Sequence, residues 1–303
     1  MKGIKAIWEL MRLEHGIMLF LAILIGSIIS QKTIYNNTDL PLINVFLTFF
    51  TALFLEASTF ALNDYYDLEI DRINKRVDRP LVRGDISPKT ALYLFFILFP
   101  LGLVCSFFVN MTCFIIALVT ALLSVLYDAK MKKIKLVGNF YIAYIMAIPF
   151  IFGGATVLEK NVFSFEKINP AIYTIALIAF LAGSGREIMK DVMDFEGDRV
   201  KGVKSFPKYI GPRKSNILAA FFFEFAVVMS FLPFFMKNFE IYYLNYYYLA
   251  LVFVTDTMLL STSLHLMLKK KPHLKLYRKF TLIAIFIGLL AFLIPIVLKI
   301  IWG

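Results

Sequence analysis

Most of the chain consists of long apolar runs separated by short polar segments. A membrane-spanning helix needs about 20 predominantly apolar residues. On that criterion we expect nine spans, near residues 16–31, 42–63, 89–109, 111–127, 137–157, 170–188, 214–236, 243–267 and 280–301. With 60% hydrophobic and 17% charged residues, the chain is not a soluble globule, since soluble domains hold about 45–50% and 25%. The sequence predicts an all-α, polytopic membrane bundle of nine transmembrane helices around a central cavity.

The basic residues alternate in density from one polar segment to the next. With nine spans, most of the 32 Lys and Arg residues fall on the side of the N-terminus. The few on the opposite side are Lys32, Lys160, Lys167, Lys237 and Lys299. Because cytoplasmic loops carry the excess of Lys and Arg, we expect a cytoplasmic N-terminus and an external C-terminus. Orientation then explains the net charge of +11 without nucleic acid as a partner.

The longest polar connections, 64–88 and 189–213, each carry a cluster of acidic residues, within what we expect to be one domain spanning residues 1–303. Asp64, Asp67 and Asp71 follow the spacing i, i+3, i+7, which places them on one face of a helix. A second cluster repeats that spacing: Asp191, Asp194 and Asp198. A solvated acidic helix end explains one cluster, but two copies at the ends of parallel spans favour a shared site. Repeated elements in membrane folds commonly enclose such a site.

Carboxylates gathered in this way suit a hard divalent cation, and Mg²⁺ prefers oxygen ligands and phosphate. The expected ligands are the acidic residues and one amide: Asn63, Asp64, Asp67, Asp71, Asp191, Asp194 and Asp198. Basic residues follow both clusters: Arg72, Arg79, Arg83, Lys201 and Lys204. Acids and bases together indicate a clamp for a metal-bound diphosphate, although such bases also serve to orient a membrane protein. Because the site lies at the end of apolar spans, we expect the hydrocarbon chain of its ligand to lie among the helices. The ligand would then be a lipid diphosphate.

These motifs resemble the UbiA superfamily of intramembrane prenyltransferases over nearly the whole chain. Asn63, Asp64, Asp67 and Asp71 match its first signature, and Asp191, Asp194 and Asp198 match its second. The segment Tyr127-Asp128-Ala129-Lys130-Met131-Lys132-Lys133 is similar to a third, with Lys where the family has Arg, and Gly138-Asn139 follows it. The resemblance implies Mg²⁺-dependent transfer of a prenyl group from a prenyl diphosphate.

The resemblance also implies roles for individual residues. Its catalytic residues would be Asp67, Asp198, Lys132 and Tyr127, and the position of Glu56 inside the second span adds Glu56 as a catalytic candidate. Its substrate-binding residues would be Arg12, Arg72, Arg79, Arg83, Lys130, Lys132, Asn139, Lys201 and Lys204. We favour Lys132 among the lysines for the diphosphate. Arg12 and His15 are candidates for an acceptor phosphate, with interfacial anchoring as the alternative.

The group that takes the acceptor's proton stays open at this level. Glu56 lies two helical turns before Asn63, and Glu224 and Asp256 also lie inside apolar spans. Carboxyl groups within a membrane usually face a cavity or a partner. Each is therefore either a general base or a hydrogen-bonded contact between helices, and released diphosphate is a further proton acceptor.

Within the superfamily, residues 11–16 and 190–198 resemble the archaeal digeranylgeranylglyceryl phosphate synthases. That likeness implies transfer of a geranylgeranyl group to geranylgeranylglyceryl phosphate, in archaeal ether-lipid synthesis. The alternatives are an aromatic acceptor, such as 4-hydroxybenzoate, another quinone precursor or the haem O type. A cation transporter or channel is the alternative that is not an enzyme, but its polar pathway would have to continue through the bilayer. The expected partners are the prenyl diphosphate, the acceptor and membrane lipid, with no protein partner required.

Overall fold

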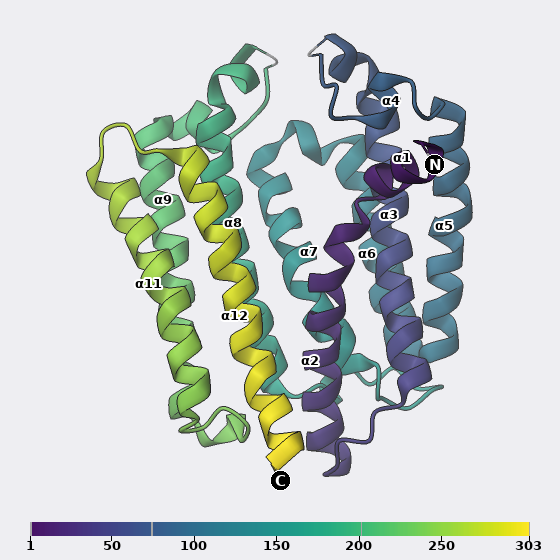
Figure 1. Cartoon of the computed structure of the whole chain (residues 1–303), viewed down its shortest axis with the longest axis vertical. Helices are drawn as coiled ribbons and strands as arrows, with labels where there is room; N and C mark the ends of the chain where they lie inside the picture. The colour runs from purple at the N-terminus through teal and green to yellow at the C-terminus, as the bar shows by residue number, and fades with distance from the viewer. Residues whose placement is uncertain (1, 74, 201, 303) are drawn as a thin grey trace.

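The computed structural model describes residues 2–73, 75–200 and 202–302, and within these ranges the regular elements are all helical. Figure 1 shows the helices running side by side along the long axis of the molecule. The longer helices are α1 (Lys2–Met11), α2 (Gly16–Tyr35), α3 (Leu42–Ile73), α5 (Pro88–Val109), α6 (Met111–Ala129), α7 (Lys135–Ala155), α8 (Pro170–Val200), α9 (Phe206–Ser230), α11 (Tyr246–Leu268) and α12 (Leu274–Trp302). Two helices of one turn, α4 (Pro80–Arg83) and α10 (Leu232–Phe235), lie in connections. Short 3₁₀ helices cover Leu13–His15, Met131–Lys133, Phe165–Lys167 and Lys237–Phe239.

Nine helices in the described part of the chain are long and apolar enough to cross a membrane, which confirms the predicted all-α, nine-span architecture. The observed helices differ from the predicted spans at the C-terminal ends of the second and sixth spans. We expected polar connections from residues 64 and 189, but α3 continues to Ile73 and α8 to Val200. A helix of 32 residues is about 48 Å long at 1.5 Å per residue, which exceeds a hydrocarbon core of about 30 Å. Both acidic motifs are therefore helical, on extensions beyond the apolar spans.

The predicted hairpin between the third and fourth spans turns on Asn110. This fully buried residue is extended, and its side-chain oxygen accepts a hydrogen bond from the backbone N–H of Cys113 at 2.8 Å. Its amide nitrogen donates to the carbonyl of Ala155 at 2.8 Å. One asparagine therefore caps α6 and attaches the hairpin to the end of α7.

Helices α2 and α7 approach each other closely through glycine. A Cβ atom on Gly26 would lie 2.1 Å from the carbonyl oxygen of Phe150, and one on Gly153 would lie 2.1 Å from that of Ile23. The hydroxyl of Ser27 donates across the same contact to the carbonyl of Gly153 at 3.0 Å. Small residues of this kind let membrane helices pack backbone to backbone.

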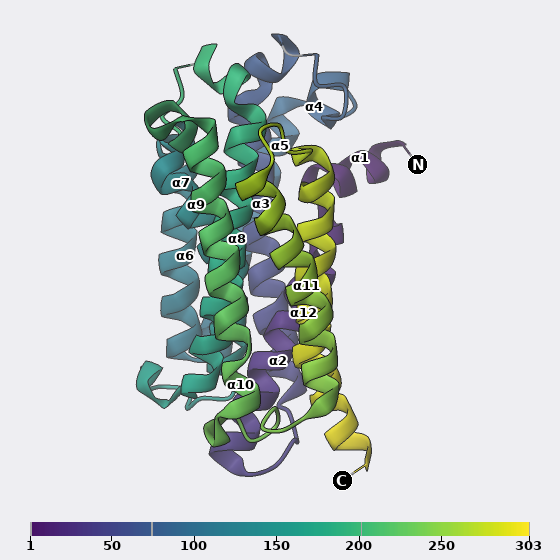
Figure 2. The same cartoon turned by 90° about the vertical axis from the view of Figure 1, so that its left-hand side faces the viewer.

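The remaining contacts arrange the helices as two halves joined around α2 and α7. Helix α3 packs on α5, α7 packs on α8, and α8 packs on α9. Helix α12 packs on α11, α8 and α2, which closes the bundle on the side of the chain's end. The largest apolar cluster includes Ile23, Ile25 and Ile172 and draws residues from α2, α7 and α8 and also from α3, α6, α11 and α12. Figure 2 shows α1 projecting sideways from the bundle near the end that carries the motifs, and the C-terminus at the opposite end.

Candidate active site

Helix α3 presents the first acidic motif, and its most buried carboxylate binds two arginines. Asp64 is 3% exposed, and its Oδ1 lies 2.7 Å from a guanidinium nitrogen of Arg79 and 3.2 Å from one of Arg12. Arg12 also covers the ring of Phe60 at 4.1 Å, and Arg79 reaches Asp71 at 3.8 Å. Asp64 therefore fastens the start of the chain and the α3–α4 connection to α3.

Asp67, three residues further along α3, has a different environment. Its Oδ1 lies 2.6 Å from Nζ of Lys132, and 27% of its side chain is exposed. Lys132 belongs to the connection between α6 and α7 and lies over the ring of Tyr66 at 5.8 Å. The structure thus brings together Asp67 and Lys132, two of the residues that we expect to be catalytic.

Helix α8 presents the second motif, and a residue that the sequence analysis did not assign binds it. Nζ of Lys135 lies 2.6 Å from Asp198 and 3.3 Å from Asp191. Asn139 donates to the other oxygen of Asp191 at 2.7 Å, and Asp191 is 2% exposed. One signal was available in the sequence, since Lys135 follows Lys132 by three residues in the same short basic segment.

The connection between α6 and α7 lies between the two motifs. Lys132 pairs with α3, and Lys135 pairs with α8. Backbone hydrogen bonds fasten the same segment to the α8–α9 connection: Lys204 N–H donates to Lys133 at 3.1 Å, and Leu136 N–H donates to Lys204 at 3.3 Å. A single short segment therefore links both halves of the site.

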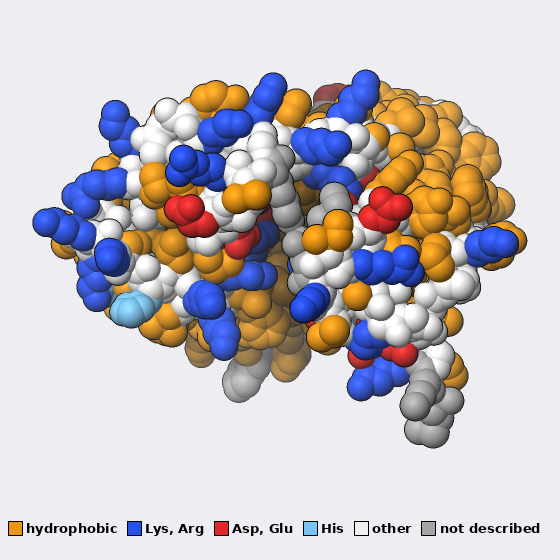
Figure 3. All heavy atoms as spheres, turned by 90° about the horizontal axis from the view of Figure 1, so that it is seen from above, with side chains coloured by type: hydrophobic (Ala, Val, Ile, Leu, Met, Phe, Trp, Pro, Cys, Tyr) orange, Lys and Arg blue, Asp and Glu red, His pale blue; other side chains and the backbone are white. Residues whose placement is uncertain are grey.

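The site borders a cleft at one end of the bundle. Figure 1 shows the ends of α3 and α8 on opposite sides of this end. Figure 3, seen from above, shows a cleft between the two halves, with Lys, Arg, Asp and Glu side chains along its rim and hydrophobic side chains at its floor. A charged rim over an apolar floor suits a ligand with a charged head and a hydrocarbon chain.

The other basic residues expected at the site differ in their contacts. Arg83 pairs with Glu9 of α1 and, at 2.6 Å, with Asp85. Arg72, Lys130 and Lys204 are exposed, whereas Lys201 lies outside the described residues. In the same α3–α4 connection, hydrogen bonds from Arg76 lower the pKa of Asp78 below its ordinary value.

The remaining residues of the expected set lie around the same end. Asn63 is partly exposed on α3, and Asp194 is exposed on α8. Tyr127, at the end of α6, stacks on Tyr141 of α7 with ring centroids 4.8 Å apart. These two rings lie next to the segment that carries Lys132.

The three candidate proton acceptors are distributed over the bundle. Glu56 of α3 lies 3.2 Å from Nδ1 of His15, and 20% of its side chain is exposed. Asp256 bonds Ser230 at 2.8 Å, and Glu224 bonds Ser263 at 2.6 Å. The last two pairs join α9 to α11, so these carboxyls are contacts between helices, which was the alternative reading of the sequence.

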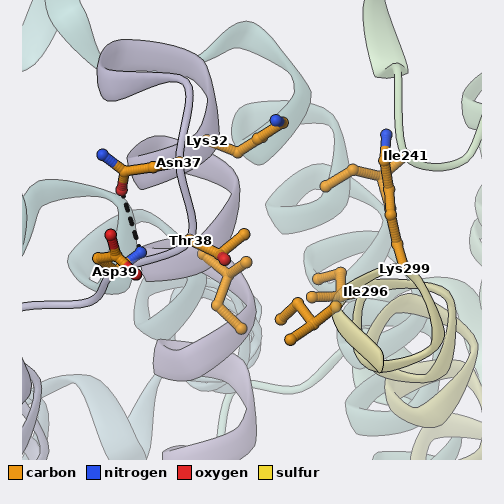
Figure 4. A pocket seen from close by; sticks show the side chains of 9 residues that line it. Lys32, Asn37, Thr38, Asp39, Ile241, Ile296 and Lys299 are labelled. Carbon is orange, nitrogen blue, oxygen red and sulfur yellow. Dashed lines mark hydrogen bonds between the residues drawn. The ribbon is translucent and has the colours of Figure 1, made fainter. Parts of the chain in front are cut away.

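A pocket of about 300 Å³ lies at the other end of the bundle, and it contains none of the predicted site residues. Figure 4 shows its lining side chains, which come from α2, from the connection after α2, from the end of α12 and, with Ile241, from the connection before α11. Asn37 and Asp39 in that connection bond to each other, as the backbone N–H of Asp39 donates to the Asn37 side chain at 3.0 Å.

The motif carboxylates differ in how well they suit a metal ion. Among the described residues, no three Asp, Glu, His or Cys side chains converge on one point. Asp67 and Asp198 each hold an ammonium group at 2.6 Å and are partly exposed, at 27% and 14% of the side chain. They are oxygen donors at positions that accept a cation, which fits the ligand preference of Mg²⁺. Asp64 fits less well than expected, since its buried Oδ1 already binds two guanidiniums.

Comparison with known proteins decides the family. The model of the UbiA prenyltransferase family matches residues 19–276. The chain belongs to the UbiA prenyltransferase family. Among curated relatives of this UbiA chain, the digeranylgeranylglyceryl phosphate synthase of Archaeoglobus fulgidus is 40% identical over 290 residues, which are 95% of this chain and 94% of the relative. That of Methanocaldococcus jannaschii is 37% identical over 296 residues, which are 97% of each protein.

Solved structures place this UbiA chain in the same fold. A structure of digeranylgeranylglyceryl phosphate synthase is 36% identical with a TM-score of 0.76, covering 98% of this chain and 99% of the other. A UbiA homologue from Archaeoglobus fulgidus, solved with DMAPP and Mg²⁺, is 17% identical with a TM-score of 0.57, covering 94% and 98%. At that identity the second likeness concerns the fold alone. The UbiA chain is a multi-pass membrane protein.

Proposed function

We propose that this chain transfers a geranylgeranyl group from its diphosphate to the free hydroxyl of geranylgeranylglyceryl phosphate, with Mg²⁺ as cofactor. One observation of the structure carries the proposal: Lys132 and Lys135, on a single segment, contact the carboxylates of both acidic motifs. Relatives that are 33–40% identical over most of the chain carry the name of this synthase, which supports the choice of acceptor. The UbiA homologues solved with DMAPP or GPP and Mg²⁺ support the donor class and the metal.

Asp67 and Asp198 would hold Mg²⁺, and Asn63, Asp71 and Asp194 would supply further oxygen atoms around them. When bound, Mg²⁺ neutralises the diphosphate and stabilises it as a leaving group. The buried Asp64 would not bind the metal directly. It would hold Arg12 and Arg79 in position beside the site. Asp191 would orient Lys135 in the same way, because Asn139 and Lys135 occupy both of its oxygens.

Lys132 and Lys135 would donate to the oxygens of the diphosphate. A lysine ammonium is a point charge on a flexible stem, so it exchanges one anionic partner for another with little rearrangement. Negative charge collects on the diphosphate as the allylic C–O bond breaks. The two ammonium groups therefore stabilise the transition state more strongly than the bound substrate. The exposed Arg72, Lys130 and Lys204 would draw the diphosphate to the cleft.

The acceptor's hydroxyl would form the new ether bond to the allylic carbon as the bond to diphosphate breaks. The apolar floor of the cleft would exclude water, which otherwise captures the allylic cation. The stacked rings of Tyr127 and Tyr141 would offer their faces to the developing positive charge. The hydroxyl proton would pass to Glu56, which is partly exposed beside His15.

The site would open to the cytoplasm. The excess of Lys and Arg at the end of the bundle that carries the motifs supports this orientation. Single cysteines in place of Lys204 and Lys160 test it in intact cells of a Cys-free variant. A membrane-impermeant thiol reagent is expected to label only the cysteine at 160, and labelling at 204 alone would reverse the orientation.

One parallel assay tests the reaction itself. Purified protein receives radiolabelled geranylgeranyl diphosphate with either geranylgeranylglyceryl phosphate or 4-hydroxybenzoate. We expect a doubly prenylated glyceryl phosphate in the first reaction only, lost on chelation with EDTA and restored by Mg²⁺. Prenylated 4-hydroxybenzoate would assign an aromatic acceptor, and cation flux in liposomes without either product would assign transport.

A further inference from the structure

Arg186 of α8 is a largely buried cation that the proposed reaction does not use. Its side chain is 14% exposed, and its Nε is buried with no hydrogen-bond partner among the described residues. The nearest carboxylate, Glu187, lies 3.4 Å away, at the limit of a hydrogen bond. A buried donor without a partner is costly, and a catalytic role or a bound ion is one explanation for it.

Positive charge exceeds negative charge around this residue. Glu187, the one carboxylate that pairs with Arg186 among the described residues, makes its shorter contact to Lys190, at 2.7 Å. Arg278 of α12 lies close enough for its charge to act on Arg186, and within the described ranges Arg278 forms no ion pair of its own. Arg186 and Lys190 therefore share one carboxylate, and Arg278 adds a third positive charge from α12. Such an arrangement is stabilised by an anion with about two negative charges, which a phosphomonoester carries at neutral pH.

Arg186 points to a different face of α8 from the proposed diphosphate site. It precedes Asp191 by five residues, which places it about 7.5 Å nearer the middle of the bundle and about 140° around the helix. Asp191 faces α7, where it meets Lys135 and Asn139. Helix α12 packs directly on α8 and carries Arg278, whose charge acts on Arg186. Figure 1 shows α12 beginning beside α8 at the end of the bundle that carries the motifs.

We propose that Arg186 and Arg278, with Lys190, form a second phosphate-binding subsite that takes the phosphomonoester of the lipid acceptor. The inference rests on the proposed function, because the acceptor of that reaction carries such a phosphate beside its reacting hydroxyl. Holding the phosphate one to two turns below the diphosphate site presents that hydroxyl to the allylic carbon. It also makes the enzyme select phosphorylated acceptors over neutral ones.

The acceptor's phosphate is the variable in the test. Binding of radiolabelled geranylgeranylglyceryl phosphate and of its dephosphorylated form, geranylgeranylglycerol, is measured without donor on the purified full chain. The wild-type protein is expected to bind the phosphorylated form more tightly. Arg186→Gln and Arg278→Gln are each expected to weaken its binding and raise its KM by about 10- to 100-fold, since each removes charge-assisted hydrogen bonds. Binding of the dephosphorylated lipid and the KM for prenyl diphosphate are expected to stay unchanged, and Arg186→Lys is expected to retain most of the affinity.

Lys279→Gln is the matched control, because it removes the same charge from an exposed neighbour of Arg278 on α12. Inorganic phosphate as competitor separates a lipid site, which it displaces weakly, from a site for free phosphate, which would overturn the assignment to the acceptor. Equal affinity of the wild-type protein for both lipids would overturn the proposal. So would equal losses for both lipids in the variants, which indicate a structural role. If Arg186→Gln does not fold, Arg278→Gln supplies the same comparison of the two lipids, because Arg278 is exposed. Phosphate-dependent binding without any transfer would retain the subsite and refute the proposed function instead.

Discussion

Lys132, on the connection between α6 and α7, and Lys135, the first residue of α7, lie three residues apart, and each holds a carboxylate of a different acidic motif at 2.6 Å. The two motifs are separated by more than one hundred residues and belong to opposite halves of the bundle. The connection therefore couples α3 to α8 by charge. It also gives the site two ammonium groups with exchangeable partners.

Lys135→Gln is expected to lower kcat/KM for the prenyl diphosphate by about 10- to 100-fold, since a hydrogen bond to a charged group contributes about 1.5–3 kcal/mol. Steady-state kinetics at saturating acceptor would measure the effect. Lys133→Gln is the control, because Lys133 is exposed on the same segment and has no ion pair among the described residues. Equal kinetics for the two variants would contradict the role of Lys135.

Asp64→Asn is expected to lower the stability of the protein, whereas Asp67→Asn is expected to change its requirement for Mg²⁺. The first leaves Arg12 and Arg79 without their buried partner, which costs about 3–5 kcal/mol when a buried pair is broken. Its melting temperature in detergent should fall. Asp67 is partly exposed and pairs with one lysine, so Asp67→Asn should melt near the wild-type temperature but need more Mg²⁺ for half-maximal activity. The opposite pattern would make Asp64 the metal ligand.

Glu56→Gln is expected to lower kcat by about 100-fold or more, because general-base catalysis contributes about 10²–10⁴-fold. Single-turnover rates of product formation would separate this step from product release. Glu224→Gln serves as the control, since Glu224 bonds Ser263 between α9 and α11. Unchanged turnover in Glu56→Gln would leave the released diphosphate as the proton acceptor.

Gly153→Ala is expected to destabilise the protein by about 1–3 kcal/mol, the cost of overpacking a tight contact. The added Cβ would lie 2.1 Å from the carbonyl oxygen of Ile23, and backbone cannot move aside as a side chain can. Thermal melting in detergent would detect the change. A Cβ on Gly3 meets nothing within 4 Å, so a similar loss in Gly3→Ala would show that the α2–α7 contact is not the cause.

Much of the site was predictable because helical spacing is local. The interval between Asp64, Asp67 and Asp71 placed them together on one helix, and the second cluster repeated it. The same spacing could not predict which of the three carboxylates would be buried and which exposed. Asp64 became a buried arginine partner and Asp67 a partly exposed one, because burial depends on what packs against each turn of α3.

Lys135 shows a second limit of the sequence. Its place three residues after Lys132 was a weak signal among several lysines of that segment, and it was not assigned to the site. Its role follows from the packing of α7 on α8, which brings Nζ to Asp198 and Asp191. Glu224 and Asp256 show the reverse case, since α9 and α11 pack so that each acid meets a serine.

The sequence by itself determined the nine apolar spans and the two acidic motifs. Apolar length and helical period are properties of consecutive residues, so they need no tertiary contact to be read. The tertiary structure alone decided which cation meets which carboxylate and where charge is left unpaired, as at Arg186. The reason is physical: the strength of an ion pair depends on distance and burial, and both are set by helices that meet only after folding.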